Sequence, residues 1–190
     1  PEQTNAMLQL ATRGHCDLCL GQGAELCWME APTPLTASEV IDIFRYKTAP
    51  SFEVVFGLGA LLGDAEPAEH EVIKNFSLAI GIAYQIQDDL LDYQRGGDVD
   101  DVKKRRPSIV LAIAHDRAGG DQRRALADAW CNNTGLDSEA TRQIVSQLGA
   151  EATARELLEH HKSEALTALR PLKNRNLKIL LHRIAGKLFA

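Results

Sequence analysis

Three aspartates end an apolar stretch in the middle of the chain and could bind a metal ion. Asp88, Asp89 and Asp92 are joined by Gln85, one helical turn earlier. Residues three and four apart lie on neighbouring positions of a helix, so these side chains share one side of it. Three like charges at a helix C-terminus, where the macrodipole is already negative, are unfavourable unless cations lie among them. Grouped carboxylates suit Mg²⁺, which keeps several waters and bridges to phosphate oxygens.

A solvated acidic helix end would show the same Asp-Asp-x-x-Asp pattern, and the preceding residues distinguish the two interpretations. Ile82, Ile86 and Leu90 recur every four residues, which is typical of the buried stripe of a helix. A solvated acidic face does not normally follow such an apolar run. We therefore expect the carboxylates to form the rim of a cavity with an apolar floor, which would suit a hydrocarbon chain.

Two lysines could bind phosphate as point charges. Lys47 lies in Tyr46-Lys47-Thr48-Ala49, ahead of an apolar helical stretch, and Lys103 follows a loop that begins Gly96-Gly97-Asp98. A lone lysine is usually a surface residue, and we interpret the basic run at 104–106 as a solvated loop. A metal, a diphosphate and a hydrocarbon chain together indicate prenyl diphosphate chemistry.

Helices are expected to position all of these residues, because helical periodicity dominates and no alternating strand pattern is found. The predicted helices cover residues 2–29, 36–62, 68–93, 108–118, 122–132, 138–148, 150–169 and 172–188. We expect an interruption or bend near Gly21 and Gly23, and a kink at Pro50. Residues 94–107 are predicted to form a charged loop. The sequence therefore indicates a single all-α domain.

Composition limits the class of protein. The chain has 190 residues, of which 45% are hydrophobic and 25% charged, as in soluble globular domains. Its net charge of −5 argues against a nucleic-acid partner. No apolar run is long enough for an integral membrane segment, and no signal peptide is found, so we expect a cytoplasmic protein.

The cysteines invite a metal or redox interpretation that the spacing does not support. Cys16-x-x-Cys19 follows His15, but the second ligand pair of a closed zinc site is missing. We interpret Cys16, Cys19, Cys27 and Cys131 as ordinary buried or interfacial thiols of a reducing compartment.

The motifs also occur in a recognisable order. They are Gly21-Gln22-x-x-Glu25, Tyr46-Lys47-Thr48-Ala49, Tyr84-Gln85-x-x-Asp88-Asp89-x-x-Asp92, and Gly96-Gly97-Asp98 followed four residues later by Lys103. As a set they resemble the trans-isoprenyl diphosphate synthases, or polyprenyl synthetases. The resemblance covers essentially the whole chain but only the C-terminal part of the family's pattern. It implies an all-α, isoprenoid synthase-type helical bundle around a central cavity, usually homodimeric, with residues 1–190 as the C-terminal portion of the domain.

This resemblance implies an enzyme that condenses isopentenyl diphosphate with an allylic diphosphate after Mg²⁺-dependent ionisation of the allylic substrate. Asp88 would be a direct Mg²⁺ ligand, with Asp89 and Asp92 completing the second aspartate-rich motif. The implied substrate-contacting residues are Lys47 and Lys103 at the allylic diphosphate, Thr48 and Gln85 beside the ionising carbon, and Gln22 facing the same cavity.

The chain departs from the family's pattern in three places. Glu25 replaces the usual aspartate, and Gln94 replaces a common lysine, for which Arg95 is a candidate substitute. No first aspartate-rich motif occurs in the sequence, which begins at Pro1. With that wall of the metal site missing, we expect the chain alone to be inactive and to self-associate through exposed apolar helix faces.

Three other functions remain as alternatives to an active prenyl synthase. The chain could be a non-catalytic subunit that modulates a partner synthase. A terpene cyclase is disfavoured because the Asn/Asp-Asp-x-x-Ser-x-x-x-Glu metal motif is not found. A generic helical binding module is disfavoured by the joint spacing of the four motifs. Product chain length is left open.

Overall fold

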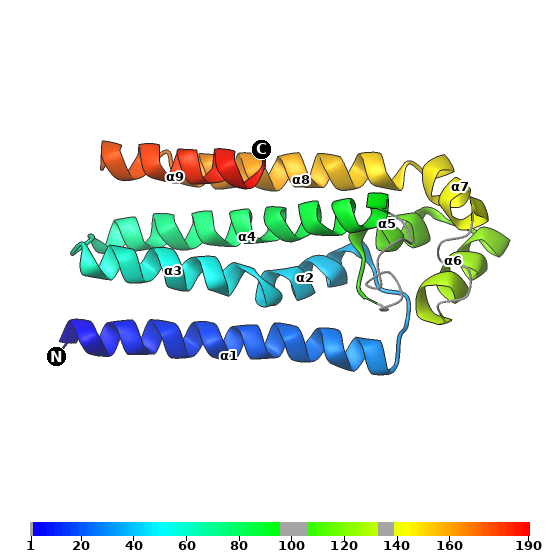
Figure 1. The fold of residues 1–190 in the computed structure, drawn as a ribbon, viewed down its shortest axis with the longest axis horizontal. Helices are drawn as coiled ribbons and strands as arrows, with labels where there is room; N and C mark the ends of the chain where they lie inside the picture. Colours follow the sequence, from blue (N-terminus) through cyan, green and yellow to red (C-terminus); the bar gives the residue numbers. More distant parts are fainter. Residues whose placement is uncertain (1, 96–105, 133–138) are drawn as a thin grey trace. The chain divides into compact units, whose positions relative to one another are not determined.

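Helices form every regular element that the structure describes. The structure is a computed structural model, and it describes residues 2–95, 106–132 and 139–190. Within these ranges the helices are α1 (Glu2–Glu30), α2 (Ala37–Lys47), α3 (Ala49–Leu62), α4 (Pro67–Arg95), α5 (Ile109–Arg117), α6 (Gly120–Asn132), α7 (Glu139–Gln147), α8 (Ala150–Ala168) and α9 (Arg175–Leu188) (Figure 1). The predicted all-α class is confirmed. None of the helices in these ranges is both long and apolar enough to cross a bilayer.

The structure corrects three main features of the predicted helices. Helix α1 continues unbroken through Gly21 and Gly23, so the expected interruption is wrong. The predicted 36–62 helix is instead two helices that separate at Thr48, where φ is −128° and ψ is −44°. Pro50 lies in the first turn of α3, where its missing N–H removes no helical hydrogen bond. Helix α4 reaches Arg95, so the predicted loop begins too early.

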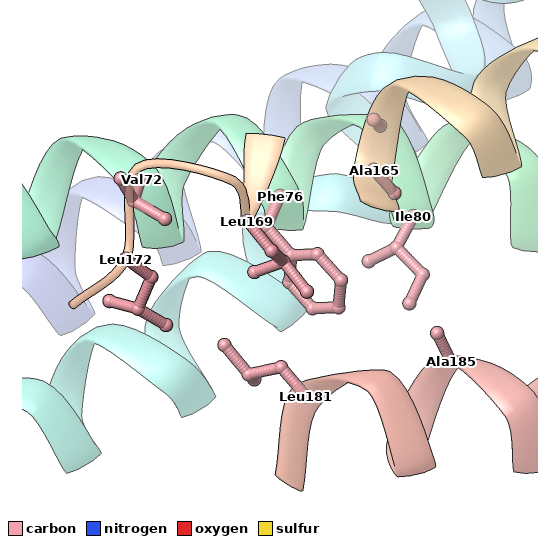
Figure 2. Packing of buried hydrophobic residues seen from close by; sticks show 9 residues of the cluster. Val72, Phe76, Ile80, Ala165, Leu169, Leu172, Leu181 and Ala185 are labelled. Carbon is pink, nitrogen blue, oxygen red and sulfur yellow. The ribbon is translucent and has the colours of Figure 1, made fainter. Parts of the chain in front are cut away.

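The chain divides into two compact units, which are described separately. The first comprises residues 1–22, 44–85 and 158–190. Its core joins α4 to the α8 and α9 region, and its buried members are Val72, Phe76, Ala79, Ile80, Ala165, Leu169, Leu172, Leu181 and Ala185 (Figure 2). The α4 members recur at helical spacing along one stripe. Phe56 of α3 extends this core, with its ring centroid 5.7 Å from that of Phe76.

The second unit comprises residues 23–43 and 86–157. Its centre is the short helix α5, in which residues 109–115 are all buried. Trp28 and Trp130 pack together with their ring centroids 5.6 Å apart. Each indole N–H has a carbonyl acceptor: Trp28 donates to Thr33 at 2.7 Å and Trp130 to Arg106 at 3.0 Å. The large apolar rings are thereby buried without leaving a polar atom unsatisfied.

The C-terminal end of α5 is tied to two other helices of the second unit. The Oδ2 atom of Asp116 accepts a hydrogen bond of 3.0 Å from the backbone N–H of Ala37, the first residue of α2. The guanidinium of Arg117 donates to the carbonyl of Leu148, just after α7, at 2.9 Å. Both contacts satisfy backbone groups at helix ends that lack an intrahelical partner.

The packing of the first unit predicts different costs for two leucine truncations. Leu169 has no exposed surface, whereas 51% of Leu180 is exposed. Leu169→Ala should lower the free energy of unfolding by about 2–5 kcal/mol, because a cavity remains in the core. Leu180→Ala should change it by less than about 0.5 kcal/mol. Urea unfolding followed by circular dichroism measures both, and equal losses would contradict the placement of the core.

Candidate active site

The segment Tyr46-Lys47-Thr48-Ala49 is held by two glycines of the first unit. A Cβ atom on Gly21 of α1 would lie 2.4 Å from the backbone nitrogen of Lys47. A Cβ atom on Gly81 of α4 would lie 2.5 Å from the Cα of Ala49. Only glycine permits such close backbone approach. The two glycines therefore determine where the backbone of Lys47 and Thr48 can lie.

Thr48 and Gln85 form a direct contact in the first unit. The Oγ1 hydroxyl of Thr48 donates to the Oε1 atom of Gln85 at 2.7 Å. Thr48 is anchored through its own backbone N–H, which donates to the carbonyl of Phe44 at 3.2 Å. Two motifs that are 37 residues apart in the sequence thus meet at one polar pair. The hydroxyl keeps its lone pairs and the amide keeps its N–H donors.

A row of aromatic rings in the first unit begins at Tyr84, the residue before Gln85. The Tyr84 and Phe52 rings meet edge to face with centroids 5.9 Å apart. Phe52 and Phe56 follow at 6.1 Å, one turn apart on α3, and Phe56 then packs on Phe76. The sequence indicates that these residues are apolar, but only the fold shows that they are continuous with one another.

Of the other predicted substrate-binding residues, Lys47 and Gln22 lie within the described residues. Lys47 is half-buried at the end of α2, and Gln22 is exposed on α1. Lys103 lies outside the described residues, as do Gly96, Gly97 and Asp98. Their roles remain predictions.

The three aspartates of α4 differ in their surroundings. Asp88 and Asp92 are exposed, whereas Asp89 is partly buried. The Oδ2 atom of Asp89 accepts hydrogen bonds from the Ser108 hydroxyl at 3.0 Å, the Ile109 N–H at 2.7 Å and the Val110 N–H at 3.4 Å. The sequence groups Asp89 with its two neighbours and gives no sign of this contact with the start of α5.

The electrostatics of Asp89 combine opposing effects. Burial raises the pKa of the Asp89 carboxyl to about 7, and the charge of Asp92 acts in the same direction. The hydrogen bonds from Ser108, Ile109 and Val110 act the other way and lower the pKa. They favour the carboxylate because each donor stabilises the charged form.

The exposed carboxylates of Asp88 and Asp92 offer the oxygen ligands that Mg²⁺ prefers. Asp88 and Asp92 lie four residues apart on α4, so both oxygen donors lie on one stripe of the helix. In the described ranges, no group of three or more histidine, cysteine, aspartate or glutamate side chains could hold a metal ion. Mg²⁺ commonly binds through one or two carboxylates, waters and substrate phosphates. Two such carboxylates are therefore compatible with an ion that also binds a diphosphate.

The four cysteines differ in exposure. Cys16, Cys19 and Cys27 are exposed on α1, and Cys131 is buried. The Sγ atom of Cys19 lies 3.7 Å from the Nε2 atom of His15. The expectation of a buried thiol therefore holds for Cys131, whereas the three thiols of α1 are on the surface.

Comparison with known proteins identifies the family. The polyprenyl synthetase family model matches residues 2–148. The chain belongs to this family, and its fold is the isoprenoid synthase fold of polyprenyl synthase structures.

Individual relatives agree with this assignment. A short chain isoprenyl diphosphate synthase of Methanocaldococcus jannaschii is 27% identical over 149 residues, which cover 75% of this chain and 45% of that protein. The structure of a geranylgeranyl pyrophosphate synthetase from Pyrococcus horikoshii superposes with a TM-score of 0.86 at 22% identity, covering 99% of this chain and 59% of that one. The structure of a Corynebacterium glutamicum geranylgeranyl pyrophosphate synthase, complexed with isoprenyl diphosphate and magnesium, superposes with a TM-score of 0.84 at 18% identity. The superposition covers 99% of this chain and 56% of that one. The chain thus spans about half the length of the curated relatives it matches.

The two glycines of α1 provide a matched test of the site's backbone. Gly21→Ala should destabilise the chain by about 1–3 kcal/mol, because the added methyl group overlaps backbone atoms of Tyr46 and Lys47. Gly23→Ala should instead stabilise it by up to about 1 kcal/mol, because nothing lies within 4 Å and alanine favours the helix. Thermal and urea unfolding measure both changes. A stable Gly21→Ala variant would show that α1 does not approach the segment closely.

Proposed function

We propose that this chain acts in a trans-prenyltransferase that condenses isopentenyl diphosphate with an allylic diphosphate. The contact between Thr48 and Gln85 carries the proposal, because it joins two motifs of the family at one polar pair. The family match and the exposed carboxylates on the same helix as Gln85 support it. We also propose that the enzyme is a cytoplasmic homodimer.

The aspartates of α4 are the proposed metal-binding residues. We propose that Asp88 binds Mg²⁺ directly and that Asp89 and Asp92 complete the motif. Mg²⁺ held there would stabilise the negative charge of the diphosphate leaving group. Support for this metal comes from the oxygen donors of Asp88 and Asp92, and from the relative with bound isoprenyl diphosphate and magnesium.

The uncharged pair is suited to the allylic carbon. The Thr48 proton is directed at Gln85, so the hydroxyl lone pairs remain for a neighbouring positive centre. A fixed dipole of this kind stabilises a carbocation without attacking it as readily as a carboxylate would. Lys47 and Lys103 would hold the allylic diphosphate, and Gln22 would face the same substrate.

Removing the proposed metal ligand tests the function. Asp88→Ala in the full-length protein should lower turnover by about 10²–10³-fold or more, because a preorganised electrostatic contact to the reacting diphosphate is lost. The fold should survive, since Asp88 is exposed and substitutions of exposed residues usually change the free energy of unfolding little. The assay combines isopentenyl diphosphate, an allylic diphosphate and Mg²⁺, followed by product sizing.

Glu30→Ala is the matched control, because it also removes an exposed anion from a helix. That variant should keep normal turnover. A folded Asp88→Ala enzyme of near-normal activity would refute the metal role. Absence of product from the unaltered full-length protein would instead favour a non-catalytic subunit.

A lysine variant tests substrate binding separately. Lys47→Ala should weaken allylic diphosphate binding by one to two decades, since a charge-assisted hydrogen bond contributes about 1.5–3 kcal/mol. Isopentenyl diphosphate binding should change less. Lys74→Ala, which removes an exposed lysine of α4 in the same unit, should affect neither substrate. Equilibrium binding of both substrates is the measurement, and unchanged allylic affinity in Lys47→Ala would make Lys47 a surface residue only.

A further inference from the structure

We propose that Asp89 is a positioning residue that clamps the start of α5 to the end of α4 and stays outside the coordination sphere of the metal. The metal part of this inference rests on the proposed function. The clamp itself rests on contacts within the second unit. This role differs from the proposed metal-binding role of Asp88 and Asp92, although the sequence pattern groups the three aspartates together.

The clamp uses a single carboxylate oxygen. The Oδ2 atom of Asp89 accepts from Ser108, Ile109 and Val110 at 3.0, 2.7 and 3.4 Å. Ile109 and Val110 open α5, and their N–H groups have no acceptor within the helix. Ser108 is the N-cap, and its Oγ accepts from the N–H of Leu111 at 3.4 Å. The first turn of α5 is therefore satisfied through Asp89, directly or by way of Ser108.

The same contacts oppose metal binding by Asp89. An oxygen that already accepts three hydrogen bonds would have to release them in order to bind a cation through that atom. Residues 109–115 are buried, so water could not readily replace the lost acceptor. Successive helical residues also differ by about 100° in direction, so the side chains of Asp88 and Asp89 leave the helix in different directions.

The contact with Asp89 can position the end of α4 because α5 is itself hydrogen-bonded to other helices at its far end. At its far end, Asp116 accepts from Ala37 and Arg117 donates to Leu148. The end of α4 is thereby fixed to a buried helix that also contacts the starts and ends of its neighbours. We infer that this fixes the direction of the Asp88 carboxylate on the adjacent position of α4.

Amide hydrogen exchange of Ile109, followed by NMR, tests the clamp. Asp89→Asn keeps the size of the side chain but loses its charge, and Ile109 should exchange about ten-fold faster or more. Asp88→Asn is the matched control and should leave Ile109 unchanged. Adding Mg²⁺ with inorganic diphosphate to the unaltered chain should also leave Ile109 protected. Faster exchange on adding Mg²⁺, or no change in Asp89→Asn, would overturn the clamp.

Binding of Mn²⁺, measured by electron paramagnetic resonance, tests the positioning role. Asp89→Asn and Ser108→Ala should weaken Mn²⁺ binding by similar factors, and the double variant should lose no more than either alone, because both act through the start of α5. A large loss in Asp89→Asn with none in Ser108→Ala would make Asp89 a direct ligand. No loss in either variant would make the contact purely structural. Both results would overturn the inference.

Separate measurements test the metal site at Asp88 and the contact between Asp89 and α5. Unchanged Mn²⁺ affinity in Asp88→Asn would refute the proposed metal site. Ile109 exchange would still decide whether Asp89 clamps α5, because that measurement needs no metal. Should Asp89→Asn fail to fold, Ser108→Ala tests the same hydrogen-bond system from the α5 side.

Discussion

The second unit depends on satisfying the first turn of a buried helix. The opening N–H groups of an α-helix have no intrahelical acceptor, and residues 109–115 of α5 are removed from water. One carboxylate oxygen of Asp89 accepts from two of those groups and from the N-cap hydroxyl. Once α5 is held, Asp116 and Arg117 at its other end satisfy the start of α2 and the backbone beyond α7. The carboxyl group of Asp89 thus stabilises the buried helix at the centre of the second unit.

The first unit depends instead on close approach between backbones. Gly21 and Gly81 leave no room for a side chain where they meet the segment between α2 and α3. That approach determines the position of Thr48, whose hydroxyl then reaches Gln85. Helix α4 carries Gln85 in one unit and, three residues later, Asp88 in the other. Close backbone packing therefore positions Thr48 and Gln85 in the first unit, whereas hydrogen bonds to a carboxylate oxygen position Asp89 in the second.

The sequence predicted the helices well because their apolar residues recur at helical spacing, as in Val72, Phe76 and Ile80. It predicted a kink at Pro50 rather than a break at Thr48, and the break also accompanies close contacts with α1 and α4 that no local pattern indicates. Gly21 was expected to weaken α1, yet its role is to admit a neighbouring backbone. The motif spacing placed Asp88, Asp89 and Asp92 together, and it could not distinguish them. Only the fold brings Ser108, 19 residues further on, to the carboxylate of Asp89.

The most direct test is the position of a metal ion relative to these aspartates. Crystals of the chain grown with Mn²⁺ and inorganic diphosphate would show the ion by its anomalous scattering. We predict an ion bound directly to a carboxylate oxygen of Asp88 and also to the diphosphate. In the same crystal, Asp89 Oδ2 should still accept from the Ile109 N–H. An ion bound by Asp89 with that hydrogen bond broken, or an ordered ion and diphosphate away from α4, would contradict this arrangement.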